Sequence, residues 1–314
     1  MSVAVTFVRR FTRYFWEIVI ATVLLVVFLV IVFSNPTAQF AWAETAGRPA
    51  PGGTYENLVY FLQVSDVHLS KFDASRGEHF SIFCNETVPV VNPALVIHTG
   101  DITDAVKFPA GSTYYQNEQF LEEWEFYKNT LVEHGYFNKS FWLDLRGNHD
   151  AFAIPHYSSP NNYFKEYAVY GDVRDYTFVL NTGFASYQFV TMDLTFDLGL
   201  SSPFDFFGLP PDNLTEVLTA VNNAANFNHT ILLGHYPRVT TIDRVPWGRL
   251  TKGKVLAYLC GHIHAKTMWN RMPGDYLELE LAVWTSQKKK EEKKSFPNSF
   301  LFFLLFAKML SSLL

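Results

Sequence analysis

Short apolar runs separated by polar turns dominate the chain between residues 58 and 284, and five of them end in the same way. Each is rich in β-branched or aromatic residues and stops at a Gly, Asp, Asn or His. Runs of this length without polar alternation are typical of strands covered on both faces. We therefore predict strands over Val59–Val64, Ala94–Ile97, Phe141–Leu145, Thr230–Leu233 and Val255–Leu259.

Helical periodicity lies between these strands. The segment Asn117–His134 places a row of large apolar side chains on one face, with Glu122 and Glu123 off that face. A second helix is expected to begin after Pro211. Alternating strands and helices indicate an α/β fold, and in such sheets the loops at the carboxyl ends of the strands converge on one crevice. The inward-facing residues are Phe120, Trp124, Tyr127 and Leu131 in the first helix, and Leu214, Val217, Leu218 and Val221 in the second.

The stretch Ile18–Phe33 is apolar except for Thr22. Its length approaches the ~20 residues of a membrane-spanning helix, and three arginines precede it. The positive-inside rule then predicts a cytosolic tail over residues 1–13, a signal-anchor helix over 14–34 and a linker over 35–57, with everything beyond on the lumenal or extracellular side. A signal peptide cleaved near Ala41-Trp42-Ala43 is the alternative, which we favour less because the run exceeds a typical ~7–15-residue h-region.

Two further features bear on the compartment. Four N-x-[ST] sequons agree with translocation across a membrane, which predicts a glycoprotein. Cys84 and Cys260 could pair in an oxidising lumen, but two unpaired, buried cysteines are the favoured state. The sequons begin at Asn85, Asn138, Asn213 and Asn228.

The last 30 residues differ from the rest of the chain. A run of lysines and glutamates from Lys288 to Lys294 leads to the apolar stretch Phe300–Ala307, which Lys308 ends. The stretch is too short to span a bilayer comfortably, so we predict no second membrane helix. We place one domain at residues 58–284, which we expect to be truncated at its C-terminal end, and an atypical charged and hydrophobic tail at 285–314.

Composition narrows the class of protein. The chain has 314 residues, 48% of them hydrophobic and 18% charged, so it can bury a full core. A formal net charge of −5 argues against nucleic-acid binding. Two cysteines exclude a Cys-based zinc module.

The residues that follow the five strands are hard oxygen ligands and imidazoles. Carboxylate, amide oxygen and imidazole suit divalent ions such as Mn, Fe, Zn or Ni. Their number exceeds the three or four protein ligands of one catalytic ion, and fits two ions that share a carboxylate. These candidates are Asp66, His68, Asp101, Asn148, His149, His235, His262 and His264.

In their order, these motifs resemble those of the calcineurin-like metallophosphoesterases. The flanking residues, such as Gln63–Ser70, Pro93–Asp104 and Trp142–Phe152, resemble the group called transmembrane protein 62. The resemblance extends over about Leu58 to Glu280. The motifs are Asp66-x-His68, Gly100-Asp101, Gly147-Asn148-His149-Asp150, Gly234-His235 and Gly261-His262-x-His264.

The resemblance implies a metallophosphoesterase-type double β-sandwich flanked by helices, and two divalent ions. The first ion would be held by Asp66, His68, Asp101 and His264, and the second by Asp101, Asn148, His235 and His262. His149 would protonate the leaving group, and the carboxylate of Asp104 would orient His149. The substrate would be a phosphodiester or phosphomonoester, attacked by hydroxide that the metals activate.

Two other classes of function remain open from the sequence. The chain could be a non-catalytic scaffold that keeps the metal-binding fold, or an interaction protein tethered to the membrane in which the same residues are structural. Missing ligands would indicate degeneration of an enzyme, and none of the motif residues is missing.

Overall fold

The structure is a computed structural model that describes residues 58–107, 116–196, 198–199, 204–253, 255–264, 269–281 and 303–308. The chain divides into two units, residues 1–53 and 54–314, and all described residues belong to the second. The predicted anchor at 14–34, the linker at 35–57 and most of the tail lie outside the described residues. Among the residues described, no helix has both the length and the apolar character needed to cross a membrane.

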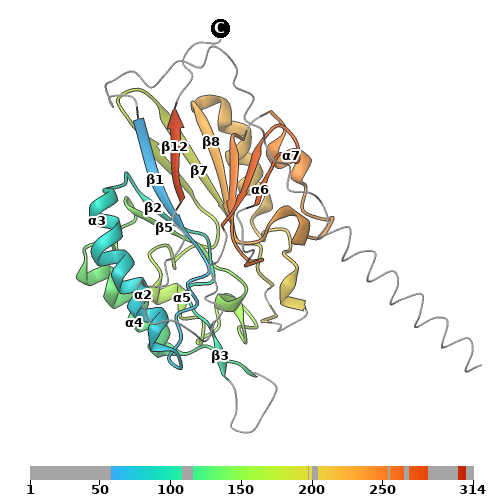
Figure 1. Cartoon of the computed structure of the whole chain (residues 1–314). Helices are drawn as coiled ribbons and strands as arrows, with labels where there is room; N and C mark the ends of the chain where they lie inside the picture. The colour runs from blue at the N-terminus through green and yellow to red at the C-terminus, as the bar shows by residue number, and fades with distance from the viewer. Residues whose placement is uncertain are drawn as a thin grey trace, which may run out of the picture. The chain divides into compact units, whose positions relative to one another are not determined.

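One sheet has four strands in the order β12-β1-β2-β5. β1, β2 and β5 are mutually parallel, and β12 is antiparallel to β1 (Figure 1). The parallel strands end at the same edge of the sheet, so the loops that follow them start close together. The strands are β1 (Leu58–Val64), β2 (Val96–His98), β5 (Trp142–Asp144) and β12 (Phe303–Lys308).

A second sheet has six strands in the order β10-β11-β9-β8-β7-β6. Its four central strands are parallel, and the two edge strands are antiparallel to their neighbours. A separate short ribbon pairs β3 (Val106–Lys107) with β4 (Gln116–Asn117). The six strands are β6 (Thr177–Asn181), β7 (Ser186–Met192), β8 (His229–Gly234), β9 (Ala257–Cys260), β10 (Trp269–Arg271) and β11 (Leu277–Glu280).

Helices cover the outer faces of both sheets, on opposite sides of the domain (Figure 1). α2, α3 and α4 lie beside the first sheet, and α6 and α7 lie beside the second. Short π and 3₁₀ turns connect several of them. The α-helices are α2 (Ala74–Ile82), α3 (Val88–Val91), α4 (Leu121–Glu133), α5 (Phe164–Tyr167), α6 (Leu214–Asn222) and α7 (Trp247–Thr251). The turns are η2 (Phe83–Thr87), η3 (His149–Ala151), η4 (Phe204–Phe206), η5 (Asn223–Asn226) and η6 (Arg238–Thr240).

The two sheets pack face to face around one apolar core. Phe61 of β1 meets Phe189 of β7 edge-on, with ring centroids 5.6 Å apart. Beside them Gln63 crosses between the sheets, because its Nε2 donates to Thr99 Oγ1 and to the carbonyl oxygen of Cys260, each at 3.1 Å. The layers are therefore helix, sheet, sheet, helix, as the resemblance to the calcineurin-like metallophosphoesterases implies.

Trp142 of β5 anchors the helices on the first sheet. Phe80 of α2 contacts it edge-on at 6.2 Å, and Tyr127 of α4 donates to Asp144 and accepts from the Trp142 indole. On the second sheet, Trp247 of α7 packs edge-on against Tyr258 of β9. Large aromatic side chains therefore join each helical layer to its sheet.

The five predicted strands are present, with ends shifted by one or two residues. The first predicted helix begins at Leu121 rather than Asn117, because Gln116–Asn117 form β4 instead. Glu123, predicted to face away from the core, is only 2% exposed. Phe303–Lys308, assigned from sequence to a tail, pairs with the edge of β1. Both cysteines are free and buried, as expected.

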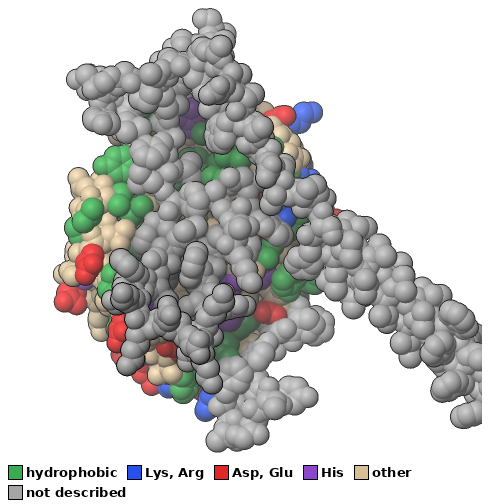
Figure 2. Space-filling view, in the orientation of Figure 1, with side chains coloured by type: hydrophobic (Ala, Val, Ile, Leu, Met, Phe, Trp, Pro, Cys, Tyr) green, Lys and Arg blue, Asp and Glu red, His purple; other side chains and the backbone are tan. Residues whose placement is uncertain are grey.

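The surface of the described residues mixes charged, uncharged polar and apolar side chains. In the space-filling view, acidic side chains lie along the edge where Figure 1 places α2 and α4, among apolar and uncharged ones (Figure 2). Histidine side chains are visible lower in the centre of the same view.

Candidate metal centre

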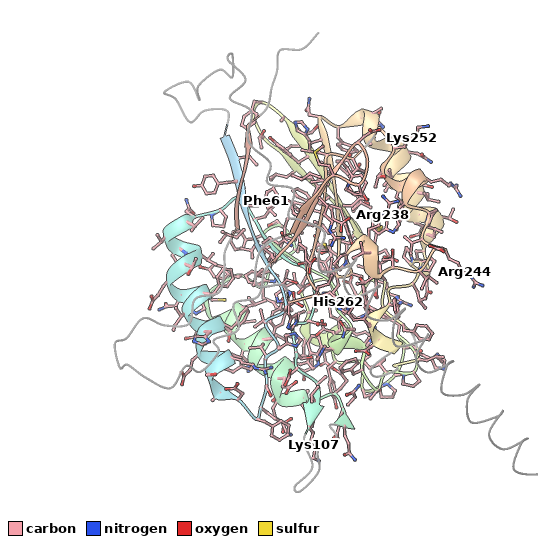
Figure 3. All side chains as sticks on the ribbon, turned by 45° about the vertical axis from the view of Figure 1, so that its right-hand side comes forward. Phe61, Lys107, Arg238, Arg244, Lys252 and His262 are labelled. Carbon is pink, nitrogen blue, oxygen red and sulfur yellow. The ribbon has the colours of Figure 1, made fainter. Side chains whose placement is uncertain are left out.

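The five loops that carry the candidate ligands meet at the carboxyl ends of the parallel strands. β1, β2 and β5 supply residues from the first sheet, and β8 and β9 supply residues from the second. Figure 3 places His262 near the centre of the molecule, at the lower end of the strands, while Phe61 lies higher on β1. The convergence that the sequence predicts is therefore present.

The first group joins Asp66, His68, Asp101 and His264. Nε2 of His264 lies 3.1 Å from Asp66 Oδ1 and 2.9 Å from His68 Nε2. Two imidazole nitrogens this close need a proton or a metal ion between them, because two lone pairs would repel each other.

The second group joins Asp101, Asn148, His235 and His262. Asn148 Oδ1 lies 3.0 Å from both His235 Nε2 and His262 Nδ1, and Asp101 Oδ2 lies 3.2 Å from His235 Nε2. The four atoms therefore surround one point between loops that come from both sheets.

Carbonyl oxygens determine which nitrogen of each imidazole carries the proton. His235 Nδ1 lies 2.8 Å from the carbonyl oxygen of Thr99, and His262 Nε2 lies 3.1 Å from that of Phe206. A carbonyl oxygen only accepts, so each of these nitrogens donates. In the neutral ring the other nitrogen is then a bare lone pair that faces Asn148 and Asp101.

With both rings neutral, the second group therefore gathers four acceptors that face one another. These atoms are two imidazole nitrogens, one amide oxygen and one carboxylate oxygen, with neighbouring atoms 3.0 to 3.2 Å apart. The donor set thus fits a divalent ion that prefers nitrogen and oxygen ligands.

Asp101 lies between the two groups. Its Oδ2 lies 3.6 Å from His68 Nε2 and 3.2 Å from His235 Nε2, so one oxygen faces both. The other oxygen, Oδ1, accepts the main-chain N–H of His149 at 2.9 Å. This hydrogen bond fixes the rotation of the carboxylate.

The charges of the buried groups favour a cation. Burial raises the pKa of Asp101, but His235 and His149 outweigh it and hold that pKa well below its usual value. Burial lowers the pKa of His235, but Asp101 raises it to about 9. Burial and the neighbouring His235 lower the pKa of His262 to about 3. The carboxylates therefore favour positive charge in the site, whereas not every imidazole can take a proton there. A divalent ion supplies positive charge without protonating an imidazole.

Strained backbone is concentrated at the same place. Five of the candidate ligands have positive φ angles of 48° to 85°, a region that non-glycine residues enter at a cost. Strain of this kind persists where the surroundings enforce it, and it clusters at functional sites. The five are Asp66, His68, Asp101, His262 and His264.

Two glycines let the loops approach one another. A Cβ at Gly147 would lie 2.1 Å from Asp101 Oδ1, and one at Gly261 would lie 2.3 Å from Asp66 Oδ2. No side chain fits at such distances. Each glycine therefore brings a motif from another strand directly against a ligand carboxylate.

His149 is oriented differently from the expectation. Its Nδ1 lies 2.5 Å from the main-chain carbonyl oxygen of Asp104, not from the carboxylate. The Asp104 carboxylate pairs with Arg76 Nη1 at 2.7 Å and lies 3.6 Å from His68 Nδ1. The turn after β2 thus presents the carbonyl oxygen of Asp104 to the ring, whereas the expectation had named its carboxylate.

Two buried acids that the sequence analysis did not assign hold the loops in place. Asp150 accepts the main-chain N–H groups of Ile102, Thr103 and Gly147, at 2.9 to 3.1 Å. Glu123 accepts those of Lys71 and Ala105, each at 3.1 Å. A motif pattern reveals Asp150, which follows His149, but no local signal marks Glu123.

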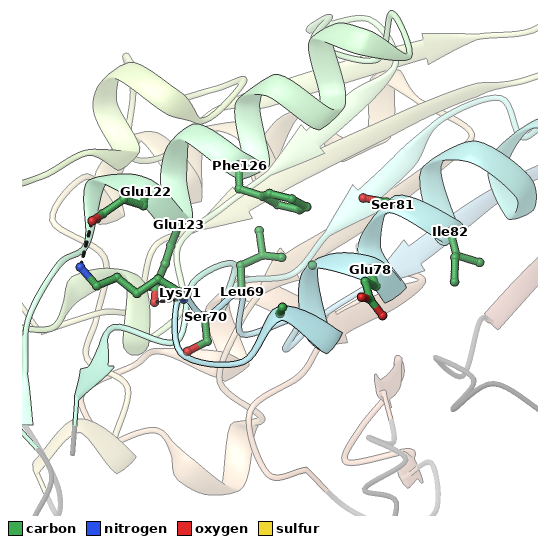
Figure 4. A pocket seen from close by; sticks show the side chains of 11 residues that line it. Leu69, Ser70, Lys71, Glu78, Ser81, Ile82, Glu122, Glu123 and Phe126 are labelled. Carbon is green, nitrogen blue, oxygen red and sulfur yellow. Dashed lines mark hydrogen bonds and ion pairs between the residues drawn. The ribbon is translucent and has the colours of Figure 1, made fainter. Parts of the chain in front are cut away.

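A cavity of about 680 Å³ lies between α2 and α4, apart from the candidate ligands (Figure 4). Leu69, Ile82 and Phe126 form its apolar part, and an ion pair between Lys71 and Glu122 lies at one end. None of the eight candidate ligands lines it.

Comparison with known proteins agrees with this architecture. The family model described as calcineurin-like phosphoesterase matches residues 59–266. Transmembrane protein 62 of Mus musculus is 35% identical over 252 residues, covering 77% of this chain and 38% of that protein. A protein of Arabidopsis thaliana named as a metallophosphoesterase is 30% identical over 255 residues, covering 77% of this chain and 34% of its own.

The chain spans little more than a third of the length of these two relatives. Among solved structures, a 5′-nucleotidase from Candida albicans superposes with a TM-score of 0.43 and 13% identity, covering 76% of this chain and 47% of that one.

Proposed function

Since the chain belongs to the calcineurin-like phosphoesterase family, we propose that it is a membrane-anchored phosphoesterase with two divalent ions, acting on a phosphomonoester or phosphodiester. The observation that carries the proposal is the second group of acceptors, whose imidazole protons point outward to carbonyl oxygens and whose lone pairs point inward. Lone pairs that point inward in this way are suited to binding a cation.

In this proposal the two groups of residues have distinct tasks. Asp66, His68 and His264 hold one ion, Asn148, His235 and His262 hold the other, and Asp101 is shared. Two bound ions would lower the pKa of a water between them toward ~7 and neutralise charge on the phosphoryl oxygens. No ligand expected from the motifs is absent from the two groups, which supports an enzyme rather than a degenerate relative.

His149 is proposed to donate the proton to the leaving oxygen. Its Nδ1 faces the Asp104 carbonyl, so Nδ1 carries a proton and Nε2 is the nitrogen left to exchange one with substrate. The ring lies against His68, with centroids 4.4 Å apart, and therefore borders the first group. A general acid must lie beside the reacting centre in this way.

Metal analysis of the purified full chain with paired assays tests the proposal. We expect close to two ions per chain after Mn²⁺ loading, with hydrolysis of p-nitrophenyl phosphate, bis-p-nitrophenyl phosphate or both. The ratio of the two rates separates monoesterase from diesterase. Folded protein that binds both ions but hydrolyses neither ester would favour the non-catalytic scaffold. Folded protein that takes up no metal would rule out both the enzyme and the metal-binding scaffold.

We also propose that the catalytic domain faces the lumen or the exterior. The apolar stretch Ile18–Phe33 with its preceding arginines motivates this topology, and the name of the mouse relative agrees with membrane association. All four sequon asparagines, Asn85, Asn138, Asn213 and Asn228, are exposed, as glycan attachment requires.

Sealed microsomes test that topology. Alkaline carbonate should leave the chain in the membrane pellet, endoglycosidase should increase its gel mobility, and added protease should spare residues 58–284. Digestion of that region in sealed vesicles, with no change in gel mobility after endoglycosidase, would show that the orientation is the reverse of the one proposed.

A further inference from the structure

Asp205 reaches the metal centre from a loop that none of the motifs includes. It lies in the turn η4, after β7, and β7 runs parallel to β8 with Met192 opposite Gly234. The loop therefore starts at the same sheet edge as His235. The hydroxyl of the buried Tyr236 donates to the Asp205 carbonyl oxygen at 3.1 Å, which anchors the turn there.

The side chain of Asp205 contacts a candidate ligand. Asn148 Nδ2 donates to Asp205 Oδ2 at 3.2 Å, while Asn148 Oδ1 faces His235 and His262. An ionised carboxylate accepts only, so it selects one of the two possible orientations of the amide. The opposite orientation would direct N–H groups at the lone pairs of the imidazoles and at any cation between them.

We propose that Asp205 is a positioning residue that holds the Asn148 amide oxygen toward the second ion. The inference rests on the proposed function, because it assigns a task at that same centre. The adjacent residue acts in parallel, since the carbonyl oxygen of Phe206 accepts from His262 Nε2. One turn therefore orients two ligands of one ion, and within the described part of the chain it makes no such hydrogen bond to the first group.

Only one oxygen of the Asp205 carboxylate makes a hydrogen bond within the described part of the chain, so the side chain adds little to the stability of the metal-free fold. Asp205 Oδ1 is buried and has no hydrogen-bond partner in the described part of the chain. A buried polar atom without a partner destabilises the fold. Removing this carboxylate should thus leave the metal-free protein as stable as before or more so, while the amide loses its orientation.

Mn²⁺ titration of the full chain, followed by the EPR signal of free Mn²⁺, tests the proposal. We expect Asp205→Ala to bind one ion with unchanged affinity and the other ~10–100-fold more weakly, the usual loss for an outer-shell partner. Asp205→Asn should restore most of the affinity, because its amide oxygen accepts the same hydrogen bond. Asp243→Ala, which removes a carboxylate from an exposed turn, is the matched control and should bind as wild type.

A double-mutant cycle distinguishes positioning from general damage to the fold. If Asp205 acts through Asn148, Asp205→Ala should cause no further loss of affinity in an Asn148→Ala background. The melting temperature in EDTA should not fall in Asp205→Ala. Equal losses in both backgrounds, or Asp205→Ala binding both ions as wild type does, would overturn this inference alone. Wild-type protein that binds fewer than two ions would overturn the proposed function first.

Discussion

The main-chain carbonyl oxygen of Asp104 lies 2.5 Å from Nδ1 of His149. Because the acceptor belongs to the backbone, the orientation of this imidazole depends on the path of the turn after β2 and not on the side chain at position 104. Glu123 of α4 is one of the groups that hold this turn, since it accepts the N–H of the next residue, Ala105. The orientation of His149 therefore depends in part on a residue that does not contact it.

His149→Ala should keep both metals and lose most turnover. General acid catalysis typically contributes ~10²–10⁴-fold, and the loss should be smaller for esters whose leaving groups are acidic and need no proton. Steady-state rates with a series of aryl and alkyl phosphates, alongside metal content, measure both effects. His156→Ala, an exposed loop histidine, is the control. Equal losses for good and poor leaving groups would contradict the acid role.

Asp104→Asn separates the two ways of orienting His149. The substitution keeps the main-chain carbonyl, so the dependence of rate on the leaving group should stay close to that of wild type. If the carboxylate oriented the imidazole instead, this variant would behave like His149→Ala. Loss of the Arg76 ion pair should cost little stability, typically under about 1 kcal/mol for a partly exposed pair.

Asp101→Asn should weaken both ions, because one oxygen faces both groups. We expect losses above about 100-fold, beyond those of an outer-shell contact. Asp66→Asn serves as the comparison and should weaken mainly one ion. Calorimetric titration with Mn²⁺ resolves the two binding events. Retention of one ion at wild-type affinity in Asp101→Asn would show that the carboxylate is not shared.

Asp175 should make stability depend on pH. Burial and the neighbouring Asp193 raise its pKa from 3.8 to about 7, while its Oδ1 accepts the Asp193 N–H. The folded state thus favours the protonated acid, and this contribution to stability is complete below pH 3.8 and lost as pH rises through about 7.

Urea unfolding at pH 5, 6, 7 and 8 checks this dependence. The free energy of unfolding of wild type, relative to Asp175→Asn, should fall by about 1–3 kcal/mol over the range. Asn keeps an oxygen to accept the same N–H but does not titrate. A difference that stays constant with pH would show that Asp175 has the same pKa in the folded and unfolded chain.

Much of the centre follows from sequence because each ligand comes directly after an apolar strand. The runs before Asp66 and Asp101 are short and unmistakably apolar, and parallel strands must end at a common edge. β11 was not among the predicted strands. Its Glu278 and Glu280 alternate with leucines, so it lacks the continuous apolar run of the others, although both acids are buried.

The supporting residues could not be predicted for a different reason. Glu123 lies among other acids on α4, and nothing local distinguishes the one that turns inward to meet main-chain N–H groups. Asp205 lies in a Phe-rich loop with no motif. Its partner, Asn148, is 57 residues away, so only the packed fold brings the two side chains together.

Each of the two ligand groups draws residues from both sheets. Asp66 and His68 follow a strand of the first sheet, whereas His264 follows one of the second, and the same division separates Asn148 from His235. An ion bound by either group would therefore join the two sheets at one edge of the apolar interface between them. Sliding of one sheet over the other would then be thermodynamically linked to metal release, and occupancy of the centre would report on the alignment of the whole domain.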